Sequence, residues 1–243
     1  MIESNKQPGS LPRWLQPAYL EDRTNRLWFF CLAATLIVAG LLCWFFADQQ
    51  IALANYDLKS KATVILAEFF TIFGRTEPWI AVFLAVLIAA RIGRFQAVAA
   101  WAWFGLLSII LSGLLVPLIK ITIGRVRPGL FLEEGIYGFQ FFKIGYHFNS
   151  CPSGHATTIA TACTVFWLMN RRLGPLWVLI AAAVGVTRVI LEAHFMSDVF
   201  LGFLTGVTVT LLIQMWWISD NQRKFLMPYE ASLRLRQRAI PTI

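Results

Sequence analysis

The sequence predicts an all-α fold, a polytopic bundle of about six transmembrane helices, and two observations carry this prediction. Apolar residues make up 58% of the 243-residue chain and charged residues only 14%, whereas soluble domains run near a quarter charged. Long uncharged runs recur at residues 27–47, 95–119 and 199–219. Each run is long enough for a helix to cross roughly 30 Å of hydrocarbon. Barrel strands would alternate polar and apolar residues, so we interpret these runs as helices.

The six spans are predicted in order along the chain, separated by short polar or charged segments. They cover residues 27–46, 77–91, 95–119, 152–170, 174–193 and 196–219. A further helix is predicted over 62–73, lying at the membrane interface or folded back into the bundle. The second span is the shortest. Its uncharged part, 78–90, would cover only about 20 Å, so a start as early as Phe69 is also compatible with the sequence.

Polar and basic tails flank this membrane domain. We assign residues 1–26 to a polar N-terminal tail, 27–219 to the six-span domain and 220–243 to a basic C-terminal tail. The first span is longer than a typical signal core, so we expect it to be retained as an anchor. Six spans put both tails on one side of the membrane. That side then holds 13 of the 21 lysines and arginines, which predicts cytoplasmic termini.

Composition argues against several other classes of function. The net charge of +8 does not indicate nucleic-acid binding, because the basic residues sit in short groups between apolar spans, where membrane topology accounts for them. The four cysteines show no CxxC spacing and no metal-ligand pattern. We therefore predict no nucleic-acid partner, no metal, no cofactor and no disulfide framework.

Three segments rich in polar and charged residues are predicted to meet at the outer ends of the spans. They are residues 120–128, 151–155 and 188–198. Lys120, Arg127 and Arg188 lie at the ends of apolar helices, where an unpaired charge costs several kcal/mol. These cations would repel one another unless an anion lay between them. The planar fork of arginine and the point charge of lysine both suit phosphate oxygens.

Two histidines complete this group of residues. His194 and Asp198 are four residues apart, so their side chains are neighbours on one helix. A carboxylate that holds one imidazole nitrogen frees the other as a nucleophile or a base. His155 is placed to donate a proton to a leaving group. The backbone N–H groups near Ser153 and Gly154, at the start of a helix, would face the same anion. This set of groups indicates phosphoryl transfer without a metal.

The motifs K-x6-R-P, P-S-G-H and R-x5-H-x3-D resemble the three-part signature of the type-2 phosphatidic acid phosphatase superfamily. Every motif position matches in the right order, and the resemblance covers roughly residues 78–218. The six-span layout is similar to that of the bacterial membrane branch. Two departures are Thr187, where the family usually has serine, and Cys151, where relatives often have an aromatic residue. Threonine keeps the hydroxyl, so a phosphate contact is weakened little.

The resemblance implies a role for each matched residue. His194 would attack phosphorus and become a phosphohistidine, Asp198 would orient it, and His155 would protonate the leaving group. The phosphoryl oxygens would be held by Lys120, Arg127, Ser153, Gly154 and Arg188. The resemblance and the predicted topology together place the protein in a bacterial inner membrane, with the site facing the periplasm.

Other residues near the motifs have simpler interpretations. We treat His147 as structural, and Glu133, Glu134 and Glu192 as solvated loop carboxylates. The loop 129–149 is rich in aromatic residues. It fits either an aromatic belt at the membrane surface or a lip that admits lipid chains.

The sequence therefore predicts a lipid phosphate or lipid pyrophosphate phosphatase. Substrates of such family members include lipid A 1-phosphate, undecaprenyl pyrophosphate, phosphatidylglycerol phosphate and phosphatidic acid. The sequence does not choose among them, although the first two fit an outward-facing site best. A lipid phosphotransferase that uses the same site is the alternative enzyme, and a lipid transporter is the alternative outside catalysis. The predicted partners are the lipid substrate and membrane lipids.

Overall fold

The fold is known from a computed structural model that describes residues 23–225, with side chains described through residue 216. Most of the predicted tails, 1–26 and 220–243, therefore lies outside the described residues. Within them all regular secondary structure is helical, and the loops add only an isolated bridge between Arg125 and Phe139. This agrees with the predicted all-α class.

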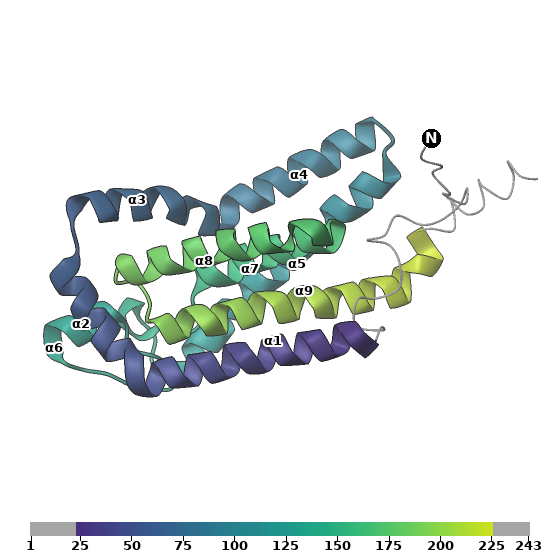
Figure 1. The fold of residues 1–243 in the computed structure, drawn as a ribbon. Helices are drawn as coiled ribbons and strands as arrows, with labels where there is room; N and C mark the ends of the chain where they lie inside the picture. Colours follow the sequence, from purple (N-terminus) through teal and green to yellow (C-terminus); the bar gives the residue numbers. More distant parts are fainter. Residues whose placement is uncertain (1–22, 226–243) are drawn as a thin grey trace, which may run out of the picture.

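The helices run side by side in one elongated bundle (Figure 1). In chain order the α-helices are α1 (Arg23–Leu42), α2 (Asp48–Leu58), α3 (Lys61–Thr71), α4 (Thr76–Ile92), α5 (Gln96–Ile123), α6 (Pro128–Glu134), α7 (Gly154–Met169), α8 (Gly174–Ile190) and α9 (Met196–Phe225). Short helical turns of other types are η2 (Cys43–Ala47), η3 (Ile72–Gly74), η4 (Tyr146–Phe148) and η5 (Arg171–Leu173). Helix α1 begins and α9 ends at the same end of the bundle (Figure 1).

The outer face of the bundle is apolar, as expected for a protein surrounded by lipid. Large side chains such as Phe46, Leu58 and Ile92 are 70 to 80% exposed, which a soluble monomer rarely tolerates over a wide area. Four helical segments among the described residues are long and apolar enough to span a membrane, and the count is five if a bent pair of helices is taken as one span. Helix α7 has only 16 residues, so the count of six spans stays a prediction.

The second predicted span is a bent pair of helices. Helix α3 and the 3-10 turn η3 run to Gly74, and α4 continues from Thr76 after a bend of 43°. Gly74 sits at the bend because its position leaves no room for a side chain. A Cβ there would lie 2.8 Å from the Cβ of His155. The predicted helix over 62–73 is thus observed as α3, and with α4 it forms either a broken span or a re-entrant loop.

Close packing of α9 against α7 brings two of the predicted motifs together. Gly202 and Gly206 are four residues apart on α9, and both face α7. A Cβ at Gly202 would lie 2.6 Å from the carbonyl oxygen of Ser153, and one at Gly206 would lie 2.4 Å from that of Thr157. Small residues at this spacing allow membrane helices to approach closely. The start of α9, with its aspartate, is therefore held against the start of α7.

Candidate active site

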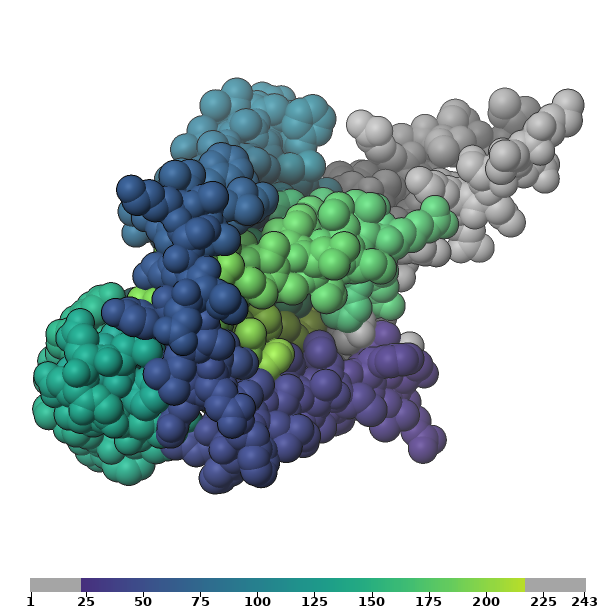
Figure 2. Space-filling view, turned by 60° about the vertical axis from the view of Figure 1, so that its left-hand side comes forward, coloured from purple at the N-terminus to yellow at the C-terminus, as the bar shows by residue number. Residues whose placement is uncertain are grey.

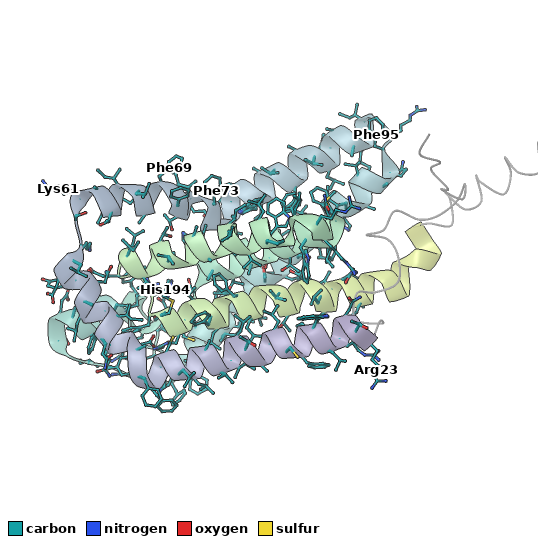
Figure 3. The ribbon with its side chains drawn as sticks, in the orientation of Figure 1. Arg23, Lys61, Phe69, Phe73, Phe95 and His194 are labelled. Atoms are coloured by element: carbon teal, nitrogen blue, oxygen red, sulfur yellow. The ribbon has the colours of Figure 1, made fainter. Side chains whose placement is uncertain are left out.

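The candidate site lies at one end of the bundle. Figure 3 shows His194 towards the end that carries Lys61, and far from Arg23 and Phe95. At this end, α2 and the loop 129–149 lie on the surface of the molecule, and α2 contacts α6 (Figure 2).

All three predicted motifs meet at this end. The backbone N–H of Ser153 donates to the backbone carbonyl of Asp198 at 3.0 Å. The guanidinium of Arg127 donates to the carbonyl of Ala193 at 3.3 Å. The segment after α5, the start of α7 and the turn between α8 and α9 are thus in direct contact.

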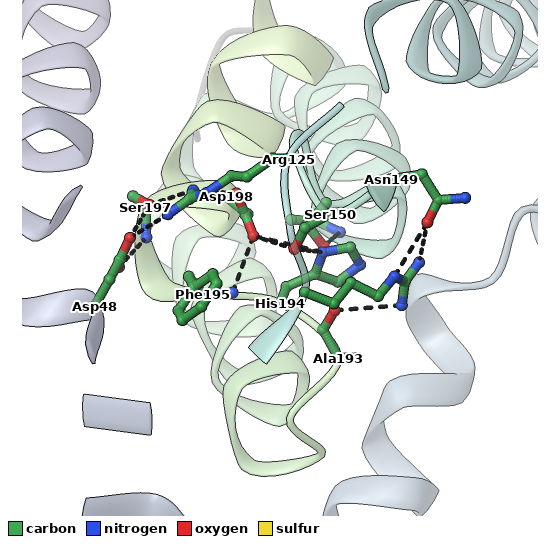
Figure 4. A network of polar contacts seen from close by, with 12 residues as sticks. Asp48, Arg125, Asn149, Ser150, Ala193, His194, Phe195, Ser197 and Asp198 are labelled. Atoms are coloured by element: carbon green, nitrogen blue, oxygen red, sulfur yellow. Dashed lines mark hydrogen bonds and ion pairs between the residues drawn. The ribbon is translucent and has the colours of Figure 1, made fainter. Parts of the chain in front are cut away.

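His194 and Asp198 are both buried but do not bond directly. The His194 Nδ1 lies 3.8 Å from the Asp198 Oδ2, which is too long for a hydrogen bond. Ser150 stands between them (Figure 4), donating from its Oγ to the Asp198 Oδ2 at 2.6 Å and lying 3.5 Å from the His194 Nδ1. The same Oδ2 accepts the backbone N–H of Phe195 at 3.0 Å. Asp198 is therefore fixed at the helix start, and Ser150 links it to the imidazole.

The second oxygen of Asp198 is bound by an arginine that the sequence analysis did not assign to the site. Arg125 is buried, and its Nη1 donates to the Asp198 Oδ1 and, at 2.6 Å, to the Ser197 Oγ. Its Nη2 donates to the Asp48 Oδ2 at 2.5 Å. The guanidinium also lies 4.3 Å from the ring centre of Trp44. Arg125 thus bridges the buried carboxylates of Asp48 and Asp198, which are far apart in the sequence (Figure 4).

Arg127 is held in place from two sides. Its Nε and Nη2 both donate to the Asn149 Oδ1, at 3.1 and 2.9 Å. Its guanidinium carbon lies 4.1 Å from the ring centre of Tyr146, a cation–π contact. These contacts, with the Ala193 carbonyl, aim the guanidinium at the turn that carries His194.

The other two predicted cations lie near the same point. Lys120, at the end of α5, interacts electrostatically with Arg127, Arg188 and Asp198. Arg188, at the end of α8, donates from its Nη1 to the Thr71 Oγ1 at 2.6 Å. Its Nε is buried and has no hydrogen-bond partner among the described residues. Three cations close together without enough acceptors form a site suited to an anion.

The start of α7 contributes backbone donors, although not as predicted. Ser153 is the N-cap: its Oγ accepts the N–H of Ala156 at 3.4 Å, and its own N–H is taken by Asp198. The first-turn N–H groups of Gly154 and His155 have no partner within the helix and remain to face an anion. The His155 ring lies among the other predicted groups. Its electrostatic neighbours include Lys120, Arg188 and His194.

Burial controls the charge of two central groups. It lowers the pKa of His194 to about 3, although Asp198 opposes the effect. The imidazole is therefore neutral at pH 7 and keeps the lone pair that a nucleophile needs. Burial would also lower the pKa of Arg125, but the carboxylates of Asp198 and Asp48 outweigh it and raise that pKa above its ordinary value. This guanidinium stays charged.

Three residues of the site were missed by the sequence analysis: Asp48, Arg125 and Ser150. The sequence contained a signal for Asp48, because it is the first charged residue after a long apolar run. Charged residues at the ends of membrane spans often have a functional role or an ionic partner. Arg125 stands two residues before Arg127, and no local pattern distinguishes their roles. Ser150 is a loop serine with no sequence signal.

The interpretation of Glu192 as a solvated carboxylate is wrong. Its side chain is only 17% exposed, and its Oε2 accepts from the Lys59 Nζ at 2.9 Å. The end of α8 and the turn after it contact α2, because Asn55 donates from its side-chain amide to the backbone carbonyls of Val189 and Ile190. These contacts tie α2 to the turn that carries His194.

The aromatic loop 129–149 divides into two halves. The rings of Tyr137 and Phe139 stack on Trp44 at centroid distances of 4.7 and 4.4 Å, above the buried Arg125. Phe141 and Phe142 instead are 67% and 71% exposed. The first half covers the ionic network, and the second presents apolar rings to the surroundings.

Removing the support of Arg127 should weaken substrate binding. In Asn149→Ala, the guanidinium loses the acceptor of two of its hydrogen bonds, each charge-assisted. We expect the KM for a lipid phosphate to rise about tenfold, with a smaller change in kcat. Asn170→Ala is the matched control, because Asn170 is exposed and only caps η5. An unchanged KM in Asn149→Ala would count against a role for Arg127 in holding phosphate.

Comparison with known proteins gives a consistent result. The profile of the PAP2 superfamily matches residues 101–223. A lipid A 1-phosphatase of Rhizobium johnstonii is 32% identical over 196 residues, which cover 76% of this chain and 79% of that protein. A bacitracin transport permease protein of Bacillus licheniformis is 30% identical over 97 residues, covering 39% of this chain and 45% of that protein.

A solved structure supports the fold independently. The PAP2-type phosphatidylglycerolphosphate phosphatase of Bacillus subtilis aligns with a TM-score of 0.54 and 22% sequence identity. The alignment covers 82% of this chain and 94% of that one. At this identity the likeness concerns the fold.

Proposed function

Given that the chain belongs to the PAP2 superfamily of membrane phosphatases, we propose that it removes phosphate from a lipid head group through a phosphohistidine at His194. Lipid A 1-phosphate is the substrate we favour. The observation that carries the proposal is the grouping of Lys120 and Arg127 around the buried imidazole of His194, with Arg188 beside Lys120 and His155. Cations around a nucleophile stabilise the charge that develops on a transferring phosphoryl group.

The reaction proceeds in two steps. The His194 Nε2 attacks phosphorus and the bond from phosphorus to the lipid oxygen breaks. His155 enters this step as the imidazolium, the form that a bound phosphate anion favours, and gives its proton to that oxygen. A water molecule then attacks the phosphohistidine and passes a proton to His155. Inorganic phosphate leaves, and both histidines return to their starting states. The first step displaces the lipid oxygen from phosphorus, and the second displaces the His194 nitrogen. One nucleophile and one acid–base group, His194 and His155, are therefore sufficient for both steps.

The remaining residues bind the phosphoryl oxygens or orient the nucleophile. Lys120, Arg127 and Arg188 supply positive charge, and the helix start at Ser153 and Gly154 supplies backbone and hydroxyl donors. Asp198 orients the imidazole with the help of Ser150. The scheme as proposed uses no metal.

The relatives favour lipid A 1-phosphate, and the aromatic loop favours a lipid substrate in general. Two relatives that align over about three quarters of this chain are lipid A 1-phosphatases of Rhizobium species, at 32% and 31% identity. Exposed aromatic rings at Phe141 and Phe142 lie on the loop beside the site, where acyl chains of a lipid would pack.

We propose that the protein lies in the inner membrane with the site facing the periplasm. Among the described residues, the end opposite the site holds Arg23 and Arg26 at the start of α1, Arg91 at the end of α4, and Arg171 and Arg172 in η5. The site end itself holds eight lysines and arginines, several of them in the site, but over the whole sequence 13 of the 21 fall on the opposite side in the predicted topology, so the positive-inside rule assigns that opposite side to the cytoplasm. A lipid head group would then enter from the outer leaflet.

A transporter is the second candidate, because one similar protein is named a bacitracin transport permease. The placement of charge favours the enzyme. Side chains that line a transport path extend through the membrane, whereas Lys120, Arg127, Arg188 and His194 gather at one end. Transport that survives His194→Ala would favour the transporter.

The assay that tests the proposal presents the purified protein with four lipid phosphates in detergent micelles. These are lipid A 1-phosphate, undecaprenyl pyrophosphate, phosphatidylglycerol phosphate and phosphatidic acid. We expect inorganic phosphate to be released fastest from lipid A and at the same rate in EDTA. Phosphate that appears on a second lipid would instead indicate a phosphotransferase. No release from any of the four would contradict the proposal.

A further inference from the structure

We propose that Asp48 and Arg125 are positioning residues of the reaction. Together with Asp198 they form one ionic unit, which holds the carboxylate in place and leaves one negative charge beside His194. This inference rests on the proposed function, because it assigns the unit a role in the attack of His194 on phosphorus. It makes the first helical segment part of the catalytic apparatus, although that segment lies outside the 101–223 region that matches the superfamily.

Both terminal nitrogens of Arg125 are bound by buried polar side chains, whereas its buried Nε has no hydrogen-bond partner among the described residues. Its side chain is 1% exposed, and its two terminal nitrogens reach Asp198, Asp48 and Ser197. The rings of Trp44 and Phe195 lie 4.3 and 4.8 Å from the guanidinium carbon. An arginine buried in this way has one available orientation. The Oδ1 of Asp198 is therefore fixed, and its Oδ2 faces Ser150 and the imidazole.

Asp48 reaches the site because the first helix changes form just before it. The π-helical turn η2 (Cys43–Ala47) separates α1 from α2, and Asp48 is the first residue of α2. Its Oδ1 accepts the backbone N–H of Ser197 at 3.0 Å, and its Oδ2 accepts from Arg125. Asp48 thus caps the start of α9 from a different helix. π-Helical turns of this kind occur frequently at functional sites.

The net charge of the ionic unit is opposite to the charge that His194 acquires when it attacks phosphorus. Two carboxylates and one guanidinium leave a single negative charge. When the Nε2 of His194 bonds to phosphorus, the neutral imidazole becomes positive. The unit is in place before the reaction and balances that charge without rearrangement. Without Asp48, Arg125 would neutralise Asp198, and the developing positive charge would lose its counterion.

The alternative is that Asp48 and Arg125 only fasten α2 to α9. A fastening role predicts that substitutions change stability and leave the chemical step unaffected. The proposal predicts a slower chemical step in a folded protein with unchanged substrate binding. The two roles therefore differ in the single-turnover rate of phosphate transfer.

The experiment compares Asp48→Asn with Asp57→Asn in full-length protein in detergent micelles. Asp57 lies on the same helix and is exposed, so it controls for loss of a carboxylate. With lipid A 1-phosphate as the probe, we expect the single-turnover rate of Asp48→Asn to fall about 10- to 100-fold, the effect typical of residues that support a reacting group. Its KM should stay within about threefold of wild type, and Asp57→Asn should match wild type in both.

A second pair of variants separates charge from shape. Asp48→Glu and Asp48→Gln have side chains of equal length, and only the first keeps the charge, so we expect Asp48→Glu to react faster. The rates of Asp48→Glu and Asp48→Gln also test the proposal if Asp48→Asn does not fold. Equal rates for this pair, or a folded Asp48→Asn as fast as wild type, would overturn the proposal. A wild-type protein that releases no phosphate from any lipid contradicts the proposed function instead.

Discussion

The His194→Ala variant should release phosphate from its lipid substrate at least about 10⁴-fold more slowly than wild type. The substitution removes the nitrogen to which phosphorus would bond, and no other described side chain occupies its place between Asp198 and the cations. Binding should survive, because Lys120, Arg127 and Arg188 are retained. Phosphate release by the purified variant, measured over hours, checks the prediction.

The matched control for this variant is His147→Ala. His147 is an exposed histidine in the loop 129–149, so its loss tests the general effect of removing an imidazole from this end of the protein. We expect its rate to stay within about threefold of wild type, as is usual for exposed positions. A His194→Ala protein that keeps a tenth of the wild-type rate would mean that another group attacks phosphorus.

The Arg125→Met variant should lose about 3–5 kcal/mol of stability. The substitution leaves the carboxylates of Asp48 and Asp198 buried and without their shared cation. An uncompensated buried charge is costly, whereas a surface ion pair contributes little. The midpoint of thermal unfolding in detergent should fall by on the order of 10 °C.

Arg75→Met makes the same substitution at a position without buried partners. The Arg75 side chain is 59% exposed, and its ion pair with Glu77 is 3.6 Å long at the surface. We expect its unfolding midpoint to differ from wild type by at most about 2 °C. If Arg125→Met unfolds at the wild-type temperature, the ionic network contributes nothing to the fold.

The sequence was sufficient to predict most of the long helices and the proximity of the candidate residues. Long apolar runs placed α1, α5, α8 and α9 within a few residues of their observed bounds, because a span in lipid must be helical. Motif order and spacing also predicted that Lys120, His155 and His194 would meet. Those residues are electrostatic neighbours in the structure.

The part that could not be predicted depends on contacts between distant segments. Arg125 and Asp48 are 77 residues apart, and nothing local to either indicates a pairing. The hydroxyl of Ser150 between His194 and Asp198 is likewise set by the path of a loop. The spacing of His194 and Asp198 predicted neighbours correctly but not the 3.8 Å separation.

The bends in the helices could not be predicted from the sequence for a different reason. The turn η2 and the bend between α3 and α4 contain no proline at the break itself, so the usual signal for a kink was missing. At Gly74 the cause is the close approach of His155, which only the packed structure reveals. These bends bring Asp48 to Arg125 and Thr71 to Arg188.

The most direct test of the account is to find where phosphate resides during turnover. Protein mixed with ³²P-labelled lipid A 1-phosphate is quenched in alkali within milliseconds, and the labelled peptide is identified by mass spectrometry. We expect an acid-labile phosphoryl group on His194 that is missing from His194→Ala. Label on any other residue, or steady phosphate release with no labelled protein at any quench time, would contradict the account.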